Sequence, residues 1–292
     1  MFANALEKVA PYTHPVIISK RLLSGHIHCG LATFIVLNNE GWILTAGHLF
    51  QDHHNYEEHK GQVSEYQQRA GAIQRSPSLK PQEKQRLLRG IPYNADWISN
   101  LSYWWGGIGQ WSEVRINPLA DLAVARLDQF NADAIATYPI FKNPNSPLRP
   151  GTSLCRLGFP FHAVSATYDE TTGNFQLADG VLPVPRFPSE GIYTREMILR
   201  DETSQAIVTM LETSSPGLGG QSGGPVFDSE GRIWGLQSHT AHLDLGFDAK
   251  YQRGNHEVIE RQFLNVGRGP DVREILKFLN IHNISYRVAE ES

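Results

Sequence analysis

A single serine in the C-terminal half of the chain lies inside a glycine-rich segment. Five glycines, at positions 217, 219, 220, 223 and 224, surround Ser222, and a proline and a short apolar run follow. Glycine tolerates positive φ, so such a segment can form a tight loop that turns backbone N–H groups inward. A tetrahedral oxyanion requires such N–H groups, which makes Ser222 a candidate nucleophile. The alternative interpretation is a glycine-rich surface loop without chemistry.

Two further residues have the types that would activate a serine. His48 follows Thr45-Ala46-Gly47, small residues that let the chain turn sharply after a strand and leave the imidazole in a cleft. Asp121 precedes the apolar run 122–127, a setting suited to a buried carboxylate that accepts a histidine N–H. Each pattern alone is more often an ordinary histidine or a strand cap. The three segments together indicate nucleophilic catalysis.

The same three segments resemble the motifs of trypsin-like serine peptidases, and are closest in pattern to the bacterial members. Residues 45–48 (Thr-Ala-Gly-His) are similar to their Thr-Ala-Ala-His, and residues 121–124 (Asp-Leu-Ala-Val) to their Asp-Leu-Ala-Val. Residues 220–225 (Gly-Gln-Ser-Gly-Gly-Pro) are similar to Gly-Asp-Ser-Gly-Gly-Pro. The order His, Asp, Ser is also that of the family. The likeness spans about residues 25–279, except the region 51–110.

The resemblance implies a serine endopeptidase that acts on protein or peptide substrates. Ser222 would attack the scissile carbonyl while His48 takes its proton and Asp121 orients the imidazole. The backbone N–H groups of Gly220 and Ser222 would hold the oxyanion. The expected walls of the substrate pocket and the strand that pairs with substrate comprise Pro216, Gln237, Ser238, His239 and Thr240.

Three positions depart from the pattern of the digestive members of the family. Gln221 replaces an Asp that pairs with a new N-terminal ammonium after zymogen cleavage, so we expect no activation of this kind. Pro216 stands six residues before Ser222, where members that cut after basic residues carry Asp, so a preference for Arg or Lys is not expected. Gln237 lies where glutamate-specific relatives carry His. A polar or acidic substrate residue therefore stays an open alternative.

The composition favours a globular, strand-rich protein. The chain has 292 residues, of which 40% are hydrophobic and 19% charged, with 26 glycines and 17 prolines that favour many turns. Short apolar runs recur in both halves, and regular alternation of strands and helices is absent. We therefore expect an all-β fold. Two small closed barrels would fit, and the resemblance implies two six-stranded antiparallel β-barrels.

The expected fold divides into two halves and a C-terminal extension. The boundaries are 1–130 for the half with His48 and Asp121, 131–150 for the linker, 151–270 for the half with Ser222, and 271–292 for a C-terminal helix and tail. Four prolines mark the linker as loop. Apolar residues at 272, 275, 276 and 279 have the spacing of an amphipathic helix.

A helical insertion is expected near residues 51–100 of the first half. This stretch is polar and poor in β-branched residues, with Pro81 at a helix start and Gly90 at its end. The insertion is either a lid or exosite, or padding of the surface. Five aromatic residues at its end form either a binding surface or, as we favour, part of the core: Trp97, Tyr103, Trp104, Trp105 and Trp111.

Composition and charge exclude several other classes. The net charge of −4 calls for neither nucleic acid nor an anionic membrane as partner, and no apolar run is long enough for a secretory leader or a membrane helix. We therefore expect a cytoplasmic protein without cofactors, controlled by a narrow substrate range or by a regulatory partner. A metal enzyme stays an alternative, based on the histidine clusters at 26–29 and 53–59. Neither cluster matches metal-ligand spacing well, and solvated or locally bonded histidines are the favoured interpretation. Cys29 and Cys155 are expected as free thiols, with a single bridge as the alternative.

Two rival functions use the same residues. Residues 220–224 also match the nucleophile elbow of α/β-hydrolases, with Asp244 or Asp248 and His256 following in that fold's order. That elbow needs a helix directly after the serine, whereas residues 224–227 have the pattern of a strand. The second rival is a trypsin-fold binding module that has lost catalysis. Such modules usually lack a member of the triad, and all three are present here.

Overall fold

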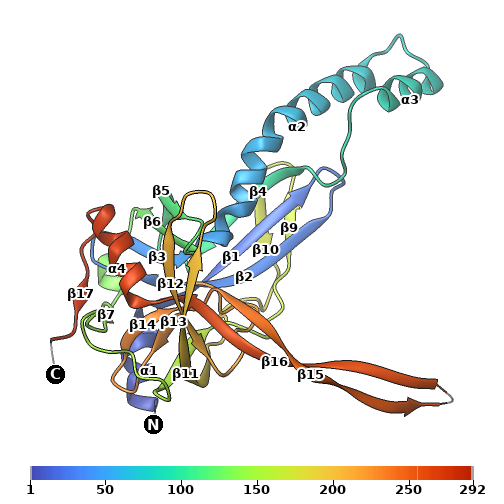
Figure 1. The fold of residues 1–292 in the computed structure, drawn as a ribbon. Coiled ribbons are helices and arrows are strands. Elements are labelled where there is room, and N and C mark those ends of the chain that lie inside the picture. The colour runs from blue at the N-terminus through green and yellow to red at the C-terminus, as the bar shows by residue number, and fades with distance from the viewer. Residues whose placement is uncertain (1, 255, 291–292) are drawn as a thin grey trace.

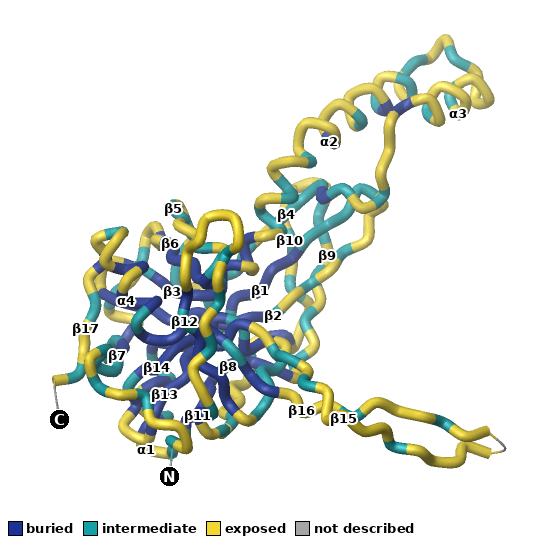
Figure 2. The backbone as a smooth tube through the Cα atoms, in the orientation of Figure 1, coloured by how far each residue is buried: buried dark blue, intermediate teal, exposed yellow. Residues whose placement is uncertain are grey.

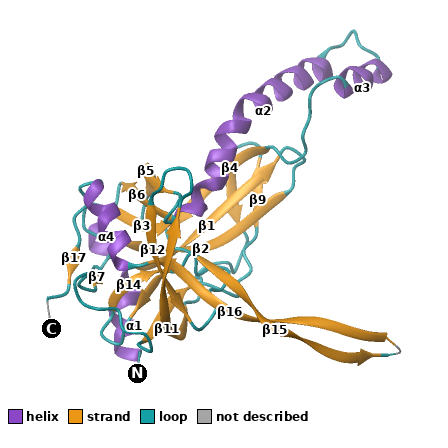
Figure 3. Ribbon diagram, in the orientation of Figure 1, coloured by secondary structure: helices purple, strands orange, loops and turns teal. Residues whose placement is uncertain are grey.

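The computed structural model describes residues 2–254 and 256–290, and two β-sheets dominate it (Figure 3). The first is an antiparallel sheet of six strands in the order β4-β1-β2-β3-β6-β5. Its strands are β1 (Thr13–Leu22), β2 (Ile27–Val36), β3 (Trp42–Ala46), β4 (Ile98–Trp105), β5 (Gln110–Asn117) and β6 (Leu122–Asp128). The expected hairpin around residues 38–41 is the β2–β3 connection, where Ile35 pairs with Leu44.

The second sheet contains nine strands in the order β15-β16-β12-β11-β8-β13-β14-β7-β17, where six were expected. Its strands are β7 (Ile140–Phe141), β8 (Ser153–Gly158), β11 (Phe187–Arg200), β12 (Ile207–Thr213), β13 (Pro225–Phe227), β14 (Arg232–Leu236), β15 (His239–Arg253), β16 (His256–Pro270) and β17 (Arg287–Val288). The strands β7 and β17 have two residues each and pair in parallel, too short to produce a sequence period. A separate two-stranded sheet pairs β9 (Ala166–Asp169) with β10 (Asn174–Leu177).

Two long hairpins project from the body of the molecule (Figure 1). One is the expected helical insertion, formed by α2 (Gln51–Arg75) and α3 (Pro81–Arg89). The other is the antiparallel ribbon β15–β16, whose pairing extends from His239 with Arg268 to Arg253 with His256. Both are exposed along most of their length (Figure 2).

The other two described α-helices lie near the ends of the chain, and short 3₁₀ helices are formed by Ala10–Tyr12, Gly47–Phe50 and Ala132–Ala134. The expected C-terminal helix is α4 (Val272–Ile281), whose N-terminus is capped by the Asp271 carboxylate accepting the backbone N–H groups of Arg273 and Glu274. The helix α1 (Ala3–Val9) has no counterpart in the sequence predictions. None of the described helices is long and apolar enough to cross a membrane.

The two sheets share one cluster of buried side chains. Phe34 and Val124 of the first sheet belong to the same cluster as Leu157 and Phe227 of the second. Cys29 and Cys155 are both free, so the single bridge is excluded. Burial in this core raises the pKa of the Cys155 thiol to about 11, which makes it a small apolar residue at neutral pH. The shared core fixes the loops between the sheets, where the candidate residues lie.

Candidate active site

His48 lies directly after β3, in a single 3₁₀ turn formed by Gly47–Phe50. The backbone N–H of Gly47 donates to the carbonyl of Asp121 over 3.0 Å, and the backbone N–H of His48 donates to Asp121 Oδ1 over 2.7 Å. A Cβ at Gly47 would lie only 3.2 Å from the carbonyl oxygen of Leu122. The turn therefore needs a small residue before the histidine, and it ties His48 to the start of β6.

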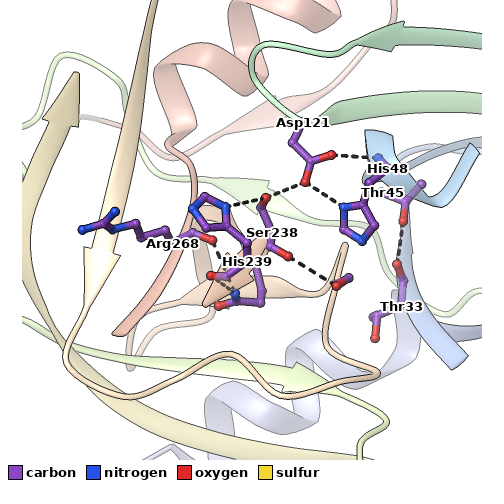
Figure 4. Close-up of polar contacts among 9 residues, drawn as sticks. Thr33, Thr45, His48, Asp121, Ser238, His239 and Arg268 are labelled. Atoms are coloured by element: carbon purple, nitrogen blue, oxygen red, sulfur yellow. Dashed lines mark hydrogen bonds and ion pairs between the residues drawn. The ribbon is translucent and has the colours of Figure 1, made fainter. Parts of the chain in front are cut away.

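The side-chain carboxylate of Asp121 accepts hydrogen bonds from three donors. Besides the backbone of His48, its Oδ2 accepts from His48 Nδ1 at 2.9 Å and from Ser238 Oγ at 2.5 Å (Figure 4). Burial raises the pKa of the Asp121 carboxyl, but the hydrogen bonds from His48 and Ser238 and the charge of His48 outweigh burial, so the net pKa is lowered. The ionised carboxylate holds the proton of His48 on Nδ1 and leaves Nε2 free to act as a base.

Ser222 joins this network through Ser238. Its Oγ donates to the carbonyl oxygen of Ser238 over 3.3 Å, and its own carbonyl accepts from the backbone N–H of Thr33 at 2.9 Å. Within the described residues, no hydrogen bond links Ser222 to His48. The hydroxyl must turn from Ser238 toward His48 for proton transfer.

Two of the five glycines around Ser222, Gly220 and Gly223, have the positive φ that the glycine-rich segment allows. Gly220 has a φ of +96°, and its carbonyl accepts from Phe159 N at 3.1 Å and from Thr33 Oγ1 at 2.7 Å. These bonds hold the carbonyl away from the loop interior. Across the described residues, the backbone N–H groups of Gly220 and Ser222 have no acceptor within the protein. Two free, neighbouring N–H groups are what an oxyanion hole requires.

Gln221 stabilises this loop with neutral hydrogen bonds. Its side chain is fully buried, its Oε1 accepts from the backbone N–H of Leu218 at 3.0 Å, and its Nε2 donates to Ser189 Oγ over 3.0 Å. No charged partner takes part in either bond. The loop therefore holds its shape without an ammonium group.

The family model for the trypsin-like peptidase domain matches residues 32–236, which is more than half of the chain. The chain belongs to this family. Among solved structures, the active form of the Rv3671c protease from M. tuberculosis is similar at a TM-score of 0.50 and 12% identity, covering 98% of this chain and 86% of that chain. The HtrA-type protease AlgW with a tripeptide has a TM-score of 0.46 at 14% identity, covering 97% of this chain and 65% of that chain. No curated protein matches the chain.

Because the first of these structures is only 12% identical to this chain, the similarity shows the fold alone. It supports the expected trypsin-like architecture, mostly β with added helices. The α/β-hydrolase alternative is wrong, because β13 and not a helix follows Ser222. Its candidate partners Asp244, Asp248 and His256 instead lie on the projecting β15–β16 hairpin.

The structure gives different contacts to the residues that the sequence predicts for the substrate pocket. Ser238 turns its hydroxyl to Asp121. Thr240 Oγ1 donates to the carbonyl of Gly217 over 2.6 Å and so joins β15 to the segment that carries Pro216. His239 Nδ1 lies 3.1 Å from Ser238 Oγ, and burial together with the Arg268 cation lowers the pKa of His239.

Gln237 is buried and contacts a residue that the sequence predictions missed. Its Oε1 accepts from Arg156 Nη1 at 2.9 Å, while its Nε2 donates to the carbonyl of His239 over 2.9 Å. Arg156 is a lone charge in the apolar strand β8, which is a signal that the sequence offered. Thr33, which fastens the nucleophile loop, carries no comparable signal. Within the described residues, no group of three His, Cys, Asp or Glu side chains is placed to hold a metal ion.

Proposed function

We propose that this chain is a serine endopeptidase that hydrolyses peptide bonds in protein substrates. The observation that carries the proposal is the hydrogen-bonded series from His48 through Asp121 and Ser238 to Ser222. It combines a base, an ionised partner and a hydroxyl in one place. The membership in the trypsin-like peptidase family supports the same reaction.

The proposed mechanism has two half-reactions, the acylation and the deacylation of Ser222. Ser222 Oγ attacks the scissile carbonyl as His48 Nε2 takes its proton, and the N–H groups of Gly220 and Ser222 bind the oxyanion. His48 then gives the proton to the leaving amine, and an acyl-enzyme forms. Water activated by His48 hydrolyses the ester bond. Asp121 stabilises the imidazolium in both steps without taking the proton.

A fluorophosphonate probe tests this proposal. We expect the wild-type chain to be labelled covalently and the Ser222→Ala variant to be unlabelled, with both folded by circular dichroism. Hydrolysis of a denatured protein should be lost in the same variant. Folded wild-type protein that neither reacts with the probe nor cleaves protein would instead favour a binding module. Adding cell extract to this assay tests for a narrow substrate range or a controlling partner.

We further propose that the enzyme is active without a freed N-terminus. Gln221 is bonded to Leu218 and Ser189, so the loop has no carboxylate to receive an N-terminal ammonium. Chains with an acetylated and with a free N-terminus should therefore have the same kcat/KM, within about twofold since no ion pair is at stake. A large gain in kcat/KM on removing the first residues, lost again on acetylation, would contradict this expectation.

A further inference from the structure

Three segments meet near Ser222: residues 215–220, the start of β15, and β16 around Gly267, whose N–H donates to the Ser215 carbonyl. In the proposed mechanism the substrate carbonyl binds the Gly220 and Ser222 N–H groups, which places the side chain that precedes the scissile bond beside these segments. The bond from Thr240 to the Gly217 carbonyl closes the two segments toward each other, and Thr240 pairs with Gly267 of β16. The chemistry at the base of these three segments decides which side chain is accepted.

The base of the three segments holds the Arg156–Gln237 pair. A Cβ at Gly217 would lie 2.1 Å from Gln237 Nε2, so the amide lies against the backbone of Gly217. A Cβ at Gly267 would lie 2.0 Å from Arg156 Nη1 and 2.8 Å from Gln237 Oε1. A side chain at either glycine would therefore clash with this pair. Gln237 also directly precedes Ser238, and its carbonyl accepts from the Gly223 N–H at 2.7 Å.

Arg156 places a buried positive charge at this site, and among the described residues no acidic side chain pairs with it. Its side chain donates only to neutral groups: Gln237 Oε1, the Ser215 carbonyl at 2.8 Å, and Ser215 Oγ. The residue is 1% exposed, and within the described part of the chain its guanidinium donates to no carboxylate. Burial lowers the pKa of the Arg156 guanidinium to about 10, so it stays charged at neutral pH. An unpaired buried cation is costly for the fold, whereas an entering carboxylate would compensate it.

Gln237 lies between the Arg156 guanidinium and Gly217, where it could contact a substrate carboxylate. With its Oε1 bonded to the guanidinium, its Nε2 is the end that faces Gly217. Nε2 donates to the His239 carbonyl over 2.9 Å and to the Arg268 carbonyl over a longer 3.3 Å. The longer bond is the one that a carboxylate would replace, because charge-assisted hydrogen bonds are about twice as strong as neutral ones.

We propose that this site selects an acidic residue, Glu or Asp, immediately before the scissile bond, with Gln237 contacting its carboxylate and Arg156 as the positioning residue behind it. The proposal rests on the proposed peptidase function. It goes beyond the family, whose members differ in this preference.

Matched substrates that differ in one residue test the inference. Peptides identical except for Glu, Gln, Lys or Val before the scissile bond are compared by kcat/KM. We expect Glu to exceed its isostere Gln by at least about tenfold, since only the carboxylate compensates the buried Arg156 charge and accepts a charge-assisted hydrogen bond. Equal rates for Glu and Gln, or a faster reaction with Lys or Val, would overturn it.

Two variants separate a role in specificity from a role in folding. Arg156→Met should bring the Glu-to-Gln ratio close to one, and Arg156→Lys should restore part of it; a structural role would lower both rates together. Gln237→Glu is nearly isosteric and pairs with Arg156, but it loses the donor to the His239 and Arg268 carbonyls, so its fold is checked by circular dichroism. The folded variant should reverse the ratio in favour of Gln. An unchanged ratio in folded Gln237→Glu protein would overturn the proposal.

A binding measurement distinguishes the two proposals. The Ser222→Ala chain does not cleave, and should still bind the Glu peptide more tightly than the Gln peptide by calorimetry. Probe labelling together with hydrolysis that ignores acidic residues overturns only the specificity. A chain that is neither labelled nor active, yet binds the Glu peptide selectively, overturns only the peptidase function.

Discussion

Replacing Asp121 with Asn is expected to lower kcat for peptide hydrolysis by about ten-thousandfold, while the chain stays folded. All three partners of this carboxylate are donors: the backbone N–H of His48, His48 Nδ1 and Ser238 Oγ. An amide offers one acceptor and one donor to these positions. If the amide nitrogen faces His48, the imidazole proton moves to Nε2, and the ring cannot take a proton from Ser222.

Steady-state rates with active-site titration measure this effect. Asp133→Asn is the matched control, since Asp133 is exposed in the connection between β6 and β7 and should leave kcat unchanged. A kcat for Asp121→Asn within tenfold of the wild type would show that Asp121 does not orient His48. Because the pKa of Asp121 is lowered, the wild-type network should be complete at neutral pH, with its stabilisation lost only as pH falls through the folded-state pKa.

The sequence patterns that predict the candidate site are local ones. His48, Asp121 and Ser222 each lie beside small residues whose need is local: Gly47 approaches the backbone of β6, and Gly220 requires a positive φ. Such constraints appear directly in the sequence as residue types. The expected all-β class, the helical insertion and the C-terminal helix follow from equally local patterns.

What the sequence did not predict depends on long-range contacts. The bond from Ser238 to Asp121 joins residues 117 apart, so no local pattern announces it. The short strand β7 pairs with the edge of β14, and β17 pairs in turn with β7, so neither strand is defined by its own sequence. The β15–β16 ribbon leaves both faces exposed, so the alternation of apolar and polar residues that identifies a half-buried strand is weak along it.

The second large effect is expected at Gly220, where a methyl group should lower kcat by about 100- to 1,000-fold through loss of an oxyanion donor. At its φ of +96°, an alanine is strained, and its Cβ would lie 2.5 Å from the carbonyl oxygen of Phe159. The chain would relieve both by rotating this peptide, which turns the Gly220 N–H away from the position that it shares with the Ser222 N–H.

Gly219→Ala provides the matched control one residue earlier in the same loop. Its Cβ would meet nothing within 4 Å, so this variant should retain wild-type kcat. Both variants are compared by kcat and by the rate of fluorophosphonate labelling, with thermal unfolding to show that each is folded. If Gly220→Ala keeps a third or more of the wild-type kcat, the oxyanion is held by other groups. If both variants lose kcat equally, the effect belongs to the flexibility of the loop and not to the Gly220 N–H.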